Sequence, residues 1–145
     1  MEINASLMAE GDIPAVASIE KASFHEPWSE NALRMLTQPN AFGIVCREGD
    51  TVAAYGGMIC VLDEGQITNI ATLPEYRRRG LAGKTLEAMI EESKRRELAF
   101  LTLEVRESNS AAIALYEKFG FVAIGKRQGF YRFPTEAAII MEKKL

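Results

Sequence analysis

Segments with strand-like and helix-like patterns alternate along the whole chain, and this alternation limits the fold more than any other feature. Runs rich in β-branched and other apolar residues predict seven strands, over residues 3–10, 41–48, 51–62, 65–73, 99–105, 121–127 and 137–144. Apolar residues at helical spacing predict four helices between them, over residues 12–24, 29–36, 80–96 and 108–120. At 145 residues, with neither a repeat nor a linker, the sequence predicts one α/β (α+β) domain over residues 1–145.

Turn and cap residues mark the ends of these elements. The Gly-Asp turn at residues 49–50 joins two strands and predicts a hairpin. We expect helices to begin at Asp12, at Ser29, and at Ser108 or Asn109, because such side chains accept hydrogen bonds from the first-turn N–H groups. The remaining breaks are prolines or glycines at the ends of segments: Pro27, Pro39, Pro74 and Gly120.

Composition excludes several classes of function. Hydrophobic residues make up 48% of the chain and charged residues 26%, as in an ordinary soluble domain, and no apolar run is long enough to span a membrane. The net charge of −3 argues against general binding of nucleic acid. We expect no secretory signal at the N-terminus, and Cys46, Cys60 and His25 make a poor metal set. We therefore expect a cytoplasmic protein with reduced, packed thiols and no metal.

Residues 74–89, PEYRRRGLAGKTLEAM, place a glycine-containing turn between a strand and a helix. One interpretation is a P-loop, G-x-x-x-x-G-K-[ST], because Gly83-Lys84-Thr85 matches its end. The first glycine of that pattern would stand where the chain has Arg78, whose side chain obstructs the backbone wrap around phosphates. The sequence therefore disfavours a nucleotide hydrolase.

The same turn fits a different anion site. Arg77-x-x-Gly80-x-Ala82 matches the pattern [RQ]-x-x-G-x-[GA] at the start of a helix. Small residues keep side chains away, so amides of residues 79–84 can face linked phosphates, with help from the helix dipole and without a metal. Three consecutive basic residues oppose the dipole there, which favours a nearby anion. The alternative is a solvated basic surface, since the six-residue pattern alone is weak.

Three longer strings resemble a known superfamily. They are ITNIATLPEYRRRGLAGKTLEAMI, LTLEVRESNSAAIALYEKFGF and FYRFPTEAAIIM, at residues 67–90, 101–121 and 130–141. Together with HEPWS at residues 25–29, they resemble the GNAT superfamily of acetyl-CoA-dependent N-acetyltransferases, and within it the bacterial ribosomal-protein-alanine N-acetyltransferase branch (RimI type). The resemblance spans nearly the whole chain. It implies a mixed, mostly antiparallel sheet of six to seven strands, with a splayed central parallel pair and about four flanking helices.

The resemblance also implies an activity, the transfer of acetyl from acetyl-CoA, a co-substrate, to the N-terminal alanine of protein eighteen of the small ribosomal subunit. An α-amine with a pKa of roughly 8 needs only a modest base. The family's proton acceptor matches Glu104, on a strand face shared with Phe100 and Thr102, where apolar neighbours would favour a protonated carboxyl. Its proton donor matches Tyr116, two helical turns after Asn109, which matches a coenzyme-contacting asparagine. The alternatives are a solvent-facing glutamate, a packing tyrosine and a plain helix cap.

By the same resemblance, coenzyme binding falls on the backbone of a splayed strand, on the anion turn and on two side chains. These residues are Ile70, Ala71 and Thr72, then Arg77, Arg78, Arg79, Gly80, Leu81, Ala82, Gly83 and Lys84, and finally Asn109 and Tyr116. Two loops, at residues 25–29 and 129–134, would flank the acceptor, with Trp28 and Tyr131 as stacking groups. Packing at the helix start is an equal alternative for Trp28. Phe130 and Ala137 depart from the branch, where a tyrosine and an acidic residue are usual, and bear on peptide specificity.

Other functions stay open on the sequence. They are acetylation of a small-molecule amine such as an amino acid, polyamine or drug, and a non-catalytic acyl-CoA-binding module. The expected partner is a protein N-terminus, that of a ribosomal protein, with no direct contact to nucleic acid or membrane and with a monomeric or weakly oligomeric chain. Arg106, two residues beyond Glu104, has no assigned role.

Overall fold

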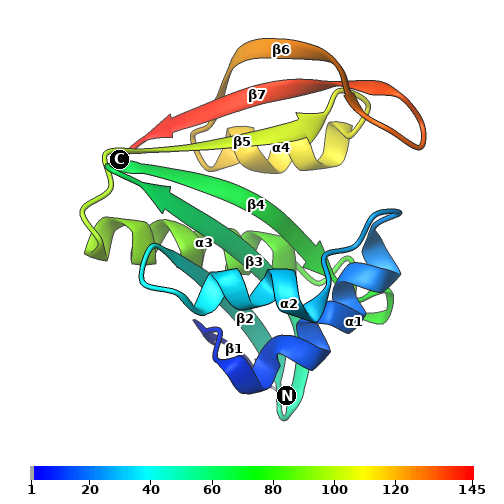
Figure 1. The fold of residues 1–145 in the computed structure, drawn as a ribbon, viewed down its shortest axis with the longest axis vertical. Helices are drawn as coiled ribbons and strands as arrows, with labels where there is room; N and C mark the ends of the chain where they lie inside the picture. Colours follow the sequence, from blue (N-terminus) through cyan, green and yellow to red (C-terminus); the bar gives the residue numbers. More distant parts are fainter. Residues whose placement is uncertain (1) are drawn as a thin grey trace.

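One seven-stranded sheet runs through the molecule in the computed structural model, which describes residues 2–145. Its strands are β1 (Ile3–Leu7), β2 (Ala41–Glu48), β3 (Thr51–Val61), β4 (Glu64–Thr72), β5 (Phe100–Arg106), β6 (Val122–Tyr131) and β7 (Glu136–Lys144). Their order is β1-β2-β3-β4-β5-β7-β6, and each neighbouring pair is antiparallel except β4 and β5 (Figure 1). The expected mixed, mostly antiparallel sheet is therefore confirmed.

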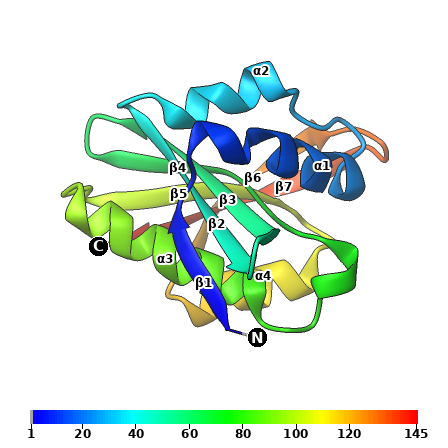
Figure 2. The ribbon, with the colours of Figure 1, turned by 90° about the horizontal axis from the view of Figure 1, so that it is seen from below.

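Helices cover both faces of the sheet. They are α1 (Ile13–Ser23), α2 (Glu30–Leu33), α3 (Leu81–Arg95) and α4 (Ser110–Lys118), with short 3-10 helices η1 (Glu10–Asp12), η2 (Arg34–Thr37) and η3 (Pro74–Tyr76). The helices α1 and α2 pack with one apolar cluster, and α3 and α4 pack with another on the opposite face (Figure 2). Within residues 2–145, no helix has the length and apolar character needed to cross a membrane.

The parallel strands β4 and β5 stay together for only three residue pairs. Glu64–Gln66 pairs with Phe100–Thr102, and beyond these residues the strands diverge (Figure 1). A bulge in β4 lies where the two strands diverge. The stretch of β4 between Ile67 and Ile70 holds one residue more than the facing part of β3. The bulge approaches Gly57 so closely that a Cβ added there would clash with the hydroxyl oxygen of Thr68. The expected splayed parallel pair is therefore present.

The local signals for helix starts give two correct predictions and one error. The Ser29 hydroxyl accepts a hydrogen bond from the Ala32 N–H at 3.1 Å, and the Asn109 side chain accepts one from the Ala112 N–H at 3.2 Å. Asp12 lies at the start of α1 but makes no such cap.

The Asp12 carboxylate instead accepts from the Ala9 N–H at 2.8 Å and pairs with Arg47 at 2.7 Å. These contacts stabilise η1, so β1 ends at Leu7 instead of continuing to residue 10 as expected. At the other end of the chain, pairing with β7 extends β6 to Tyr131, beyond the expected end at residue 127.

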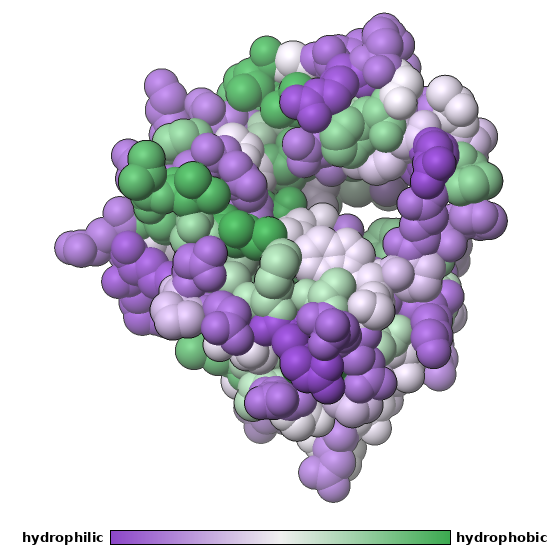
Figure 3. Space-filling view, in the orientation of Figure 1, coloured by the Kyte–Doolittle hydropathy of each residue, from purple (hydrophilic) through white to green (hydrophobic). Residues whose placement is uncertain are grey.

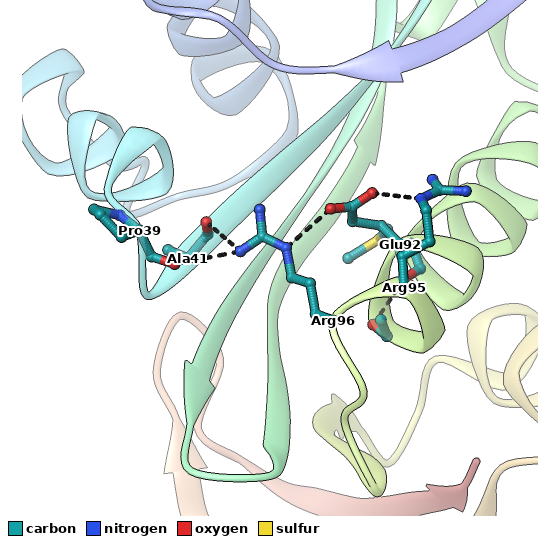
Figure 4. Close-up of polar contacts among 7 residues, drawn as sticks. Pro39, Ala41, Glu92, Arg95 and Arg96 are labelled. Atoms are coloured by element: carbon teal, nitrogen blue, oxygen red, sulfur yellow. Dashed lines mark hydrogen bonds and ion pairs between the residues drawn. The ribbon is translucent and has the colours of Figure 1, made fainter.

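The C-terminal end of α3 is fixed to the sheet by Arg96. Its guanidinium donates to the Glu92 carboxylate at 2.9 Å and to the carbonyls of Pro39 and Ala41 at 3.4 and 3.1 Å (Figure 4). The same group lies 4.6 Å from the centre of the Phe42 ring. These contacts orient the whole of α3, whose other end carries the predicted anion turn.

Candidate active site

A cavity of about 430 Å³ lies where β4 and β5 have separated. The space-filling view shows the surface hollowed in this region, between the two parts of the split sheet (Figure 3). Its wall includes six residues that the sequence predicts for the site, namely Trp28, Ile70, Glu104, Asn109, Tyr116 and Tyr131. Residues from the start, the middle and the end of the chain therefore meet at one place.

Glu104 reaches the cavity from β5. Leu103 and Val105 are buried in the apolar cluster with α3 and α4, so Glu104 points to the other side, as the alternation predicts. The carboxyl is exposed, however, which corrects the expectation of an apolar enclosure. The physical reason is the divergence of β4, which leaves this part of β5 without a parallel neighbour. A solvated carboxylate beside a cavity can accept a proton directly or through water.

Tyr116 reaches the same cavity from α4. Asn109, Ala112 and Tyr116 follow helical spacing, and all three line the wall. The Tyr116 ring packs edge-on against Phe121, with 5.7 Å between ring centroids. Burial, with a smaller contribution from nearby Tyr131, raises the pKa of Tyr116 to about 12. The hydroxyl therefore keeps its proton at neutral pH and can donate it.

The turn before α3 has the backbone form that an anion site needs. Gly80 precedes the helix with a φ of 75°, a left-handed conformation that favours glycine, and an added Cβ would meet no atom within 4 Å. The N–H groups of Leu81, Ala82 and Gly83 have no carbonyl partner within the helix. The Lys84 N–H donates to the Gly80 carbonyl at 3.1 Å. The available amide row is therefore shorter than expected and stops before Lys84.

Two of the three arginines in this turn have partners within the protein. Arg77 donates to the Thr72 carbonyl at 3.3 Å, and Arg79 lies 3.4 Å from the Glu48 carboxylate and 4.9 Å from the centre of the Tyr76 ring. Arg78 is exposed. Arg77 and Arg79 thus stabilise the local structure of the turn, whether or not they also attract an anion.

The predicted strand segment 70–72 divides in the structure. Ile70 lines the cavity and Ala71 is buried in the cluster under α1, whereas the Thr72 carbonyl accepts from Arg77. Trp28 fits both interpretations offered by the sequence, since it packs against the same apolar cluster and also lines the cavity.

A buried carboxylate that the sequence analysis missed supports this wall. Glu20 of α1 is completely buried and accepts hydrogen bonds from the Trp28 N–H at 2.8 Å, from the Asn69 side chain at 3.0 Å and from the Tyr55 hydroxyl. Burial, and then the negative charge of Glu20, raise the pKa of Tyr55, so this hydroxyl stays a donor. The signal was an acidic residue on the apolar face of α1, next to Ile19 and four residues after Val16.

The two loops that flank the cavity also contact each other. The Arg132 guanidinium lies 2.7 Å from the Glu26 carboxylate, and the rings of His25 and Phe133 lie 4.2 Å apart. In the part of the chain that the structure describes, no three His, Cys, Asp or Glu side chains are grouped to hold a metal ion.

Comparisons with known proteins give a consistent result. Residues 13–121 match the model of the acetyltransferase (GNAT) family. The [ribosomal protein bS18]-alanine N-acetyltransferase of Escherichia coli (strain K12) is 40% identical over 134 residues, which cover 90% of this chain and 89% of that protein. The protein of the same name from Salmonella typhimurium (strain LT2) is 39% identical over 140 residues, covering 94% and 93%. The crystal structure of the Escherichia coli ribosomal-protein-S18-alanine N-acetyltransferase superposes with a TM-score of 0.93 at 36% identity, covering 99% of this chain and 94% of that chain.

Proposed function

Because this chain belongs to the GNAT family of acetyltransferases, we propose that it transfers the acetyl group of acetyl-CoA to the N-terminal α-amine of a protein, the N-terminal alanine of ribosomal protein bS18. The two relatives described above, which are named for the acetylation of this alanine, match about nine-tenths of this chain or more. The reaction belongs in the cytoplasm, where ribosomal proteins are made, and the chain acts as a monomer or weak oligomer.

The separation of β4 from β5 is the observation that carries this proposal. It opens a cavity whose wall holds a carboxylate, a protonated tyrosine and an asparagine at a helix start. An acyl transfer between two large molecules needs such a place, where donor and acceptor meet at one carbonyl carbon.

The chain offers fitting groups for acetyl-CoA. The N–H groups of Leu81, Ala82 and Gly83 suit its linked phosphates, because a helix N-terminus attracts anions and the open space at Gly80 lets them approach. Asn109, at the start of α4, lines the cavity itself, unlike the turn before α3. The backbone of the diverging part of β4, near Ile70, is free of β5 and suits the amide groups of the pantetheine arm.

The protein groups then act on two protons and one carbonyl oxygen. Glu104 accepts the proton that the α-ammonium loses, directly or through water. A backbone N–H near Ile70 donates to the thioester oxygen as charge develops on it. The C–N bond forms as the C–S bond breaks, and Tyr116 donates its hydroxyl proton to the departing sulfur. The nitrogen loses its second proton as the amide forms, and this proton restores the Tyr116 hydroxyl through solvent. The proton that Glu104 accepted is released to water, so the reaction gives the amide, free coenzyme A and one proton.

The test is a direct assay with three kinds of acceptor. The purified chain and acetyl-CoA are mixed with an alanine-starting peptide, with the same peptide already acetylated at its N-terminus, or with a panel of small amines. We expect mass spectrometry to show one acetyl group on the free peptide and none on the blocked one. Turnover of small amines without turnover of the peptide would contradict the proposed acceptor. Mass spectrometry of cellular protein N-termini, with and without the protein, then identifies the natural acceptor.

A separate measurement tests the coenzyme. Calorimetry of the chain with acetyl-CoA in the presence of a chelator should show binding, because backbone amides do not require a metal to hold phosphates. If the titration gave no heat of binding, and if free coenzyme A did not compete with acetyl-CoA, the result would contradict acetyl-CoA as the donor.

A further inference from the structure

Arg106 ends β5 two residues after Glu104, on the same face of the strand, and it lines the same cavity. The chemistry proposed above does not use it. Its side chain is partly covered, with 29% of it exposed, although arginine is usually found in water. Protein groups around the Arg106 guanidinium therefore replace much of its contact with water.

The partners of Arg106 lie in the turn between β6 and β7, which we call the acceptor turn (residues 132–135). One terminal nitrogen donates to the Arg132 carbonyl at 2.7 Å, and the other donates to the Pro134 carbonyl at 2.9 Å. These carbonyls flank Phe133, whose φ of 58° is disfavoured for a residue with a side chain. Arg106 thus donates hydrogen bonds on both sides of the left-handed residue of the acceptor turn.

Two further contacts extend this hold to the cavity wall. The Arg106 guanidinium lies 4.5 Å from the centre of the Tyr131 ring, so the ring is fixed by a cation–π contact. Arg106 also donates to one oxygen of Glu136 at 3.2 Å, while the other oxygen accepts from the Ser108 N–H. Ser108 directly precedes Asn109, so one arginine links the end of β5, the acceptor turn and the start of α4.

We propose that Arg106 is a positioning residue for the acceptor, which holds the acceptor turn and the Tyr131 ring at a fixed distance from Glu104. It binds the peptide indirectly, by fixing the wall against which the peptide lies. This inference rests on the proposed function, because it assigns Arg106 to the acceptor side of the same cavity. Its loss should therefore weaken acceptor binding and leave coenzyme binding intact.

The kinetic test compares Arg106→Gln and Arg106→Lys with a matched control. Arg127→Gln also removes an arginine from over an aromatic ring, that of Phe130 at 5.3 Å, but on the exposed strand β6. We expect Arg106→Gln to raise KM for the peptide by about tenfold or more, because charge-assisted hydrogen bonds are lost. Arg106→Lys keeps the charge without the two-pronged geometry and should fall in between. Both variants should keep kcat and the acetyl-CoA Kd within about threefold, and Arg127→Gln should match the wild type.

A second measurement does not depend on activity. Hydrogen–deuterium exchange of the segment 131–136 should speed up in Arg106→Gln and stay unchanged in Arg127→Gln. An unchanged peptide KM, an equal loss of coenzyme binding, or unchanged exchange in Arg106→Gln would each overturn the inference. A wild-type protein that acetylates no peptide would overturn the proposed function, and the exchange data would still decide whether Arg106 holds the acceptor turn.

Discussion

Glu104 and Tyr116 face one cavity from two different elements, and their surroundings suit opposite tasks. Glu104 is exposed on β5 beside the cavity, where its carboxyl group can exchange a proton directly or through water. Tyr116 is mostly covered on α4, where burial raises its pKa and keeps its proton in place. The two environments fit the proposed roles of Glu104 as proton acceptor and Tyr116 as proton donor.

Replacing Glu104 should slow the chemical step. Glu104→Gln keeps the shape of the side chain but removes the proton acceptor, so we expect kcat to fall by about a hundredfold or more. Glu107→Gln is the matched control, because Glu107 is exposed three residues further along and pairs with Lys126 at the surface. Steady-state rates with the alanine-starting peptide measure both. Equal rates for Glu104→Gln and Glu107→Gln would contradict the assigned role.

Replacing Tyr116 should slow release of the sulfur without loosening the coenzyme. Tyr116→Phe retains the packing on Phe121 and removes the proton, so kcat should fall by about tenfold or more while the acetyl-CoA Kd stays unchanged. Because the pKa of Tyr116 is raised to about 12, its ionisation should not reduce kcat at neutral or mildly alkaline pH. The ratio of wild-type to variant kcat should therefore be constant there. If the ratio of wild-type to variant kcat fell as the pH rose through that range, Tyr116 would be losing its proton well below a pH of about 12, which would contradict its role as the proton donor.

At the scale of elements, the start of α3 combines a conformational requirement with the proposed coenzyme-binding role. The left-handed Gly80 turns the chain into the helix, and the contacts of Arg96 fix the other end of α3 on β2. The orientation of the free N–H groups is therefore set by both ends of the helix.

Replacing Gly80 should affect stability and coenzyme binding together. Gly80→Ala places a Cβ on a residue with a φ of 75°, which costs roughly 1 kcal/mol, although the space around it is open. The turn can relieve this strain only by moving the amides, so acetyl-CoA should bind several-fold more weakly. Gly11→Ala is the control, since its added Cβ also meets open space and its backbone is not left-handed. Urea unfolding and calorimetry measure the two effects, and a Gly80→Ala variant as stable and as tight-binding as Gly11→Ala would refute the argument.

At the scale of the whole molecule, Glu20 joins elements that are far apart in the chain. Its carboxylate accepts from Tyr55 on β3, from Asn69 in the β4 bulge and from the backbone of Trp28 in the loop after α1. One buried acid therefore fixes the bulge and one loop at the cavity, at a desolvation cost that its three donors offset.

Removing one of these donors should destabilise the whole fold. Tyr55→Phe leaves a buried carboxylate oxygen short of a hydrogen bond, which costs about 1–3 kcal/mol of unfolding free energy. Tyr76→Phe removes a hydroxyl from a half-buried tyrosine at the surface and should change stability by less than about 0.5 kcal/mol. Urea unfolding of the two variants and the wild type makes the comparison. Equal changes in the free energy of unfolding for Tyr55→Phe and Tyr76→Phe would contradict a stabilising role for the hydrogen bonds to Glu20.

Features that depend on neighbours within a few residues could be predicted from the sequence. The hairpin at residues 49–50, the caps at Ser29 and Asn109 and the turn at Gly80 follow from local hydrogen bonds and backbone preferences. The cap expected at Asp12 was wrong because Arg47, on the facing strand β2, attracts its carboxylate. A local rule failed there because a distant charge competed.

The functional roles of Glu104 and Tyr116 came from the resemblance of long strings, whereas the anion turn was predicted from its local pattern, and all three remain predictions. Folding alone brings Trp28, Glu104 and Tyr131 to one cavity. Folding alone also reveals the partners of Glu20, which lie 8 to 49 residues away along the chain, and those of Arg106, which lie 25 to 30 residues away. Local pattern sets each strand and helix, because a few dihedral angles and nearby hydrogen bonds decide them. The separation of β4 from β5 was predicted only from the resemblance, because it depends on pairing between strands that lie far apart along the chain, and this pairing exists only once the chain is folded.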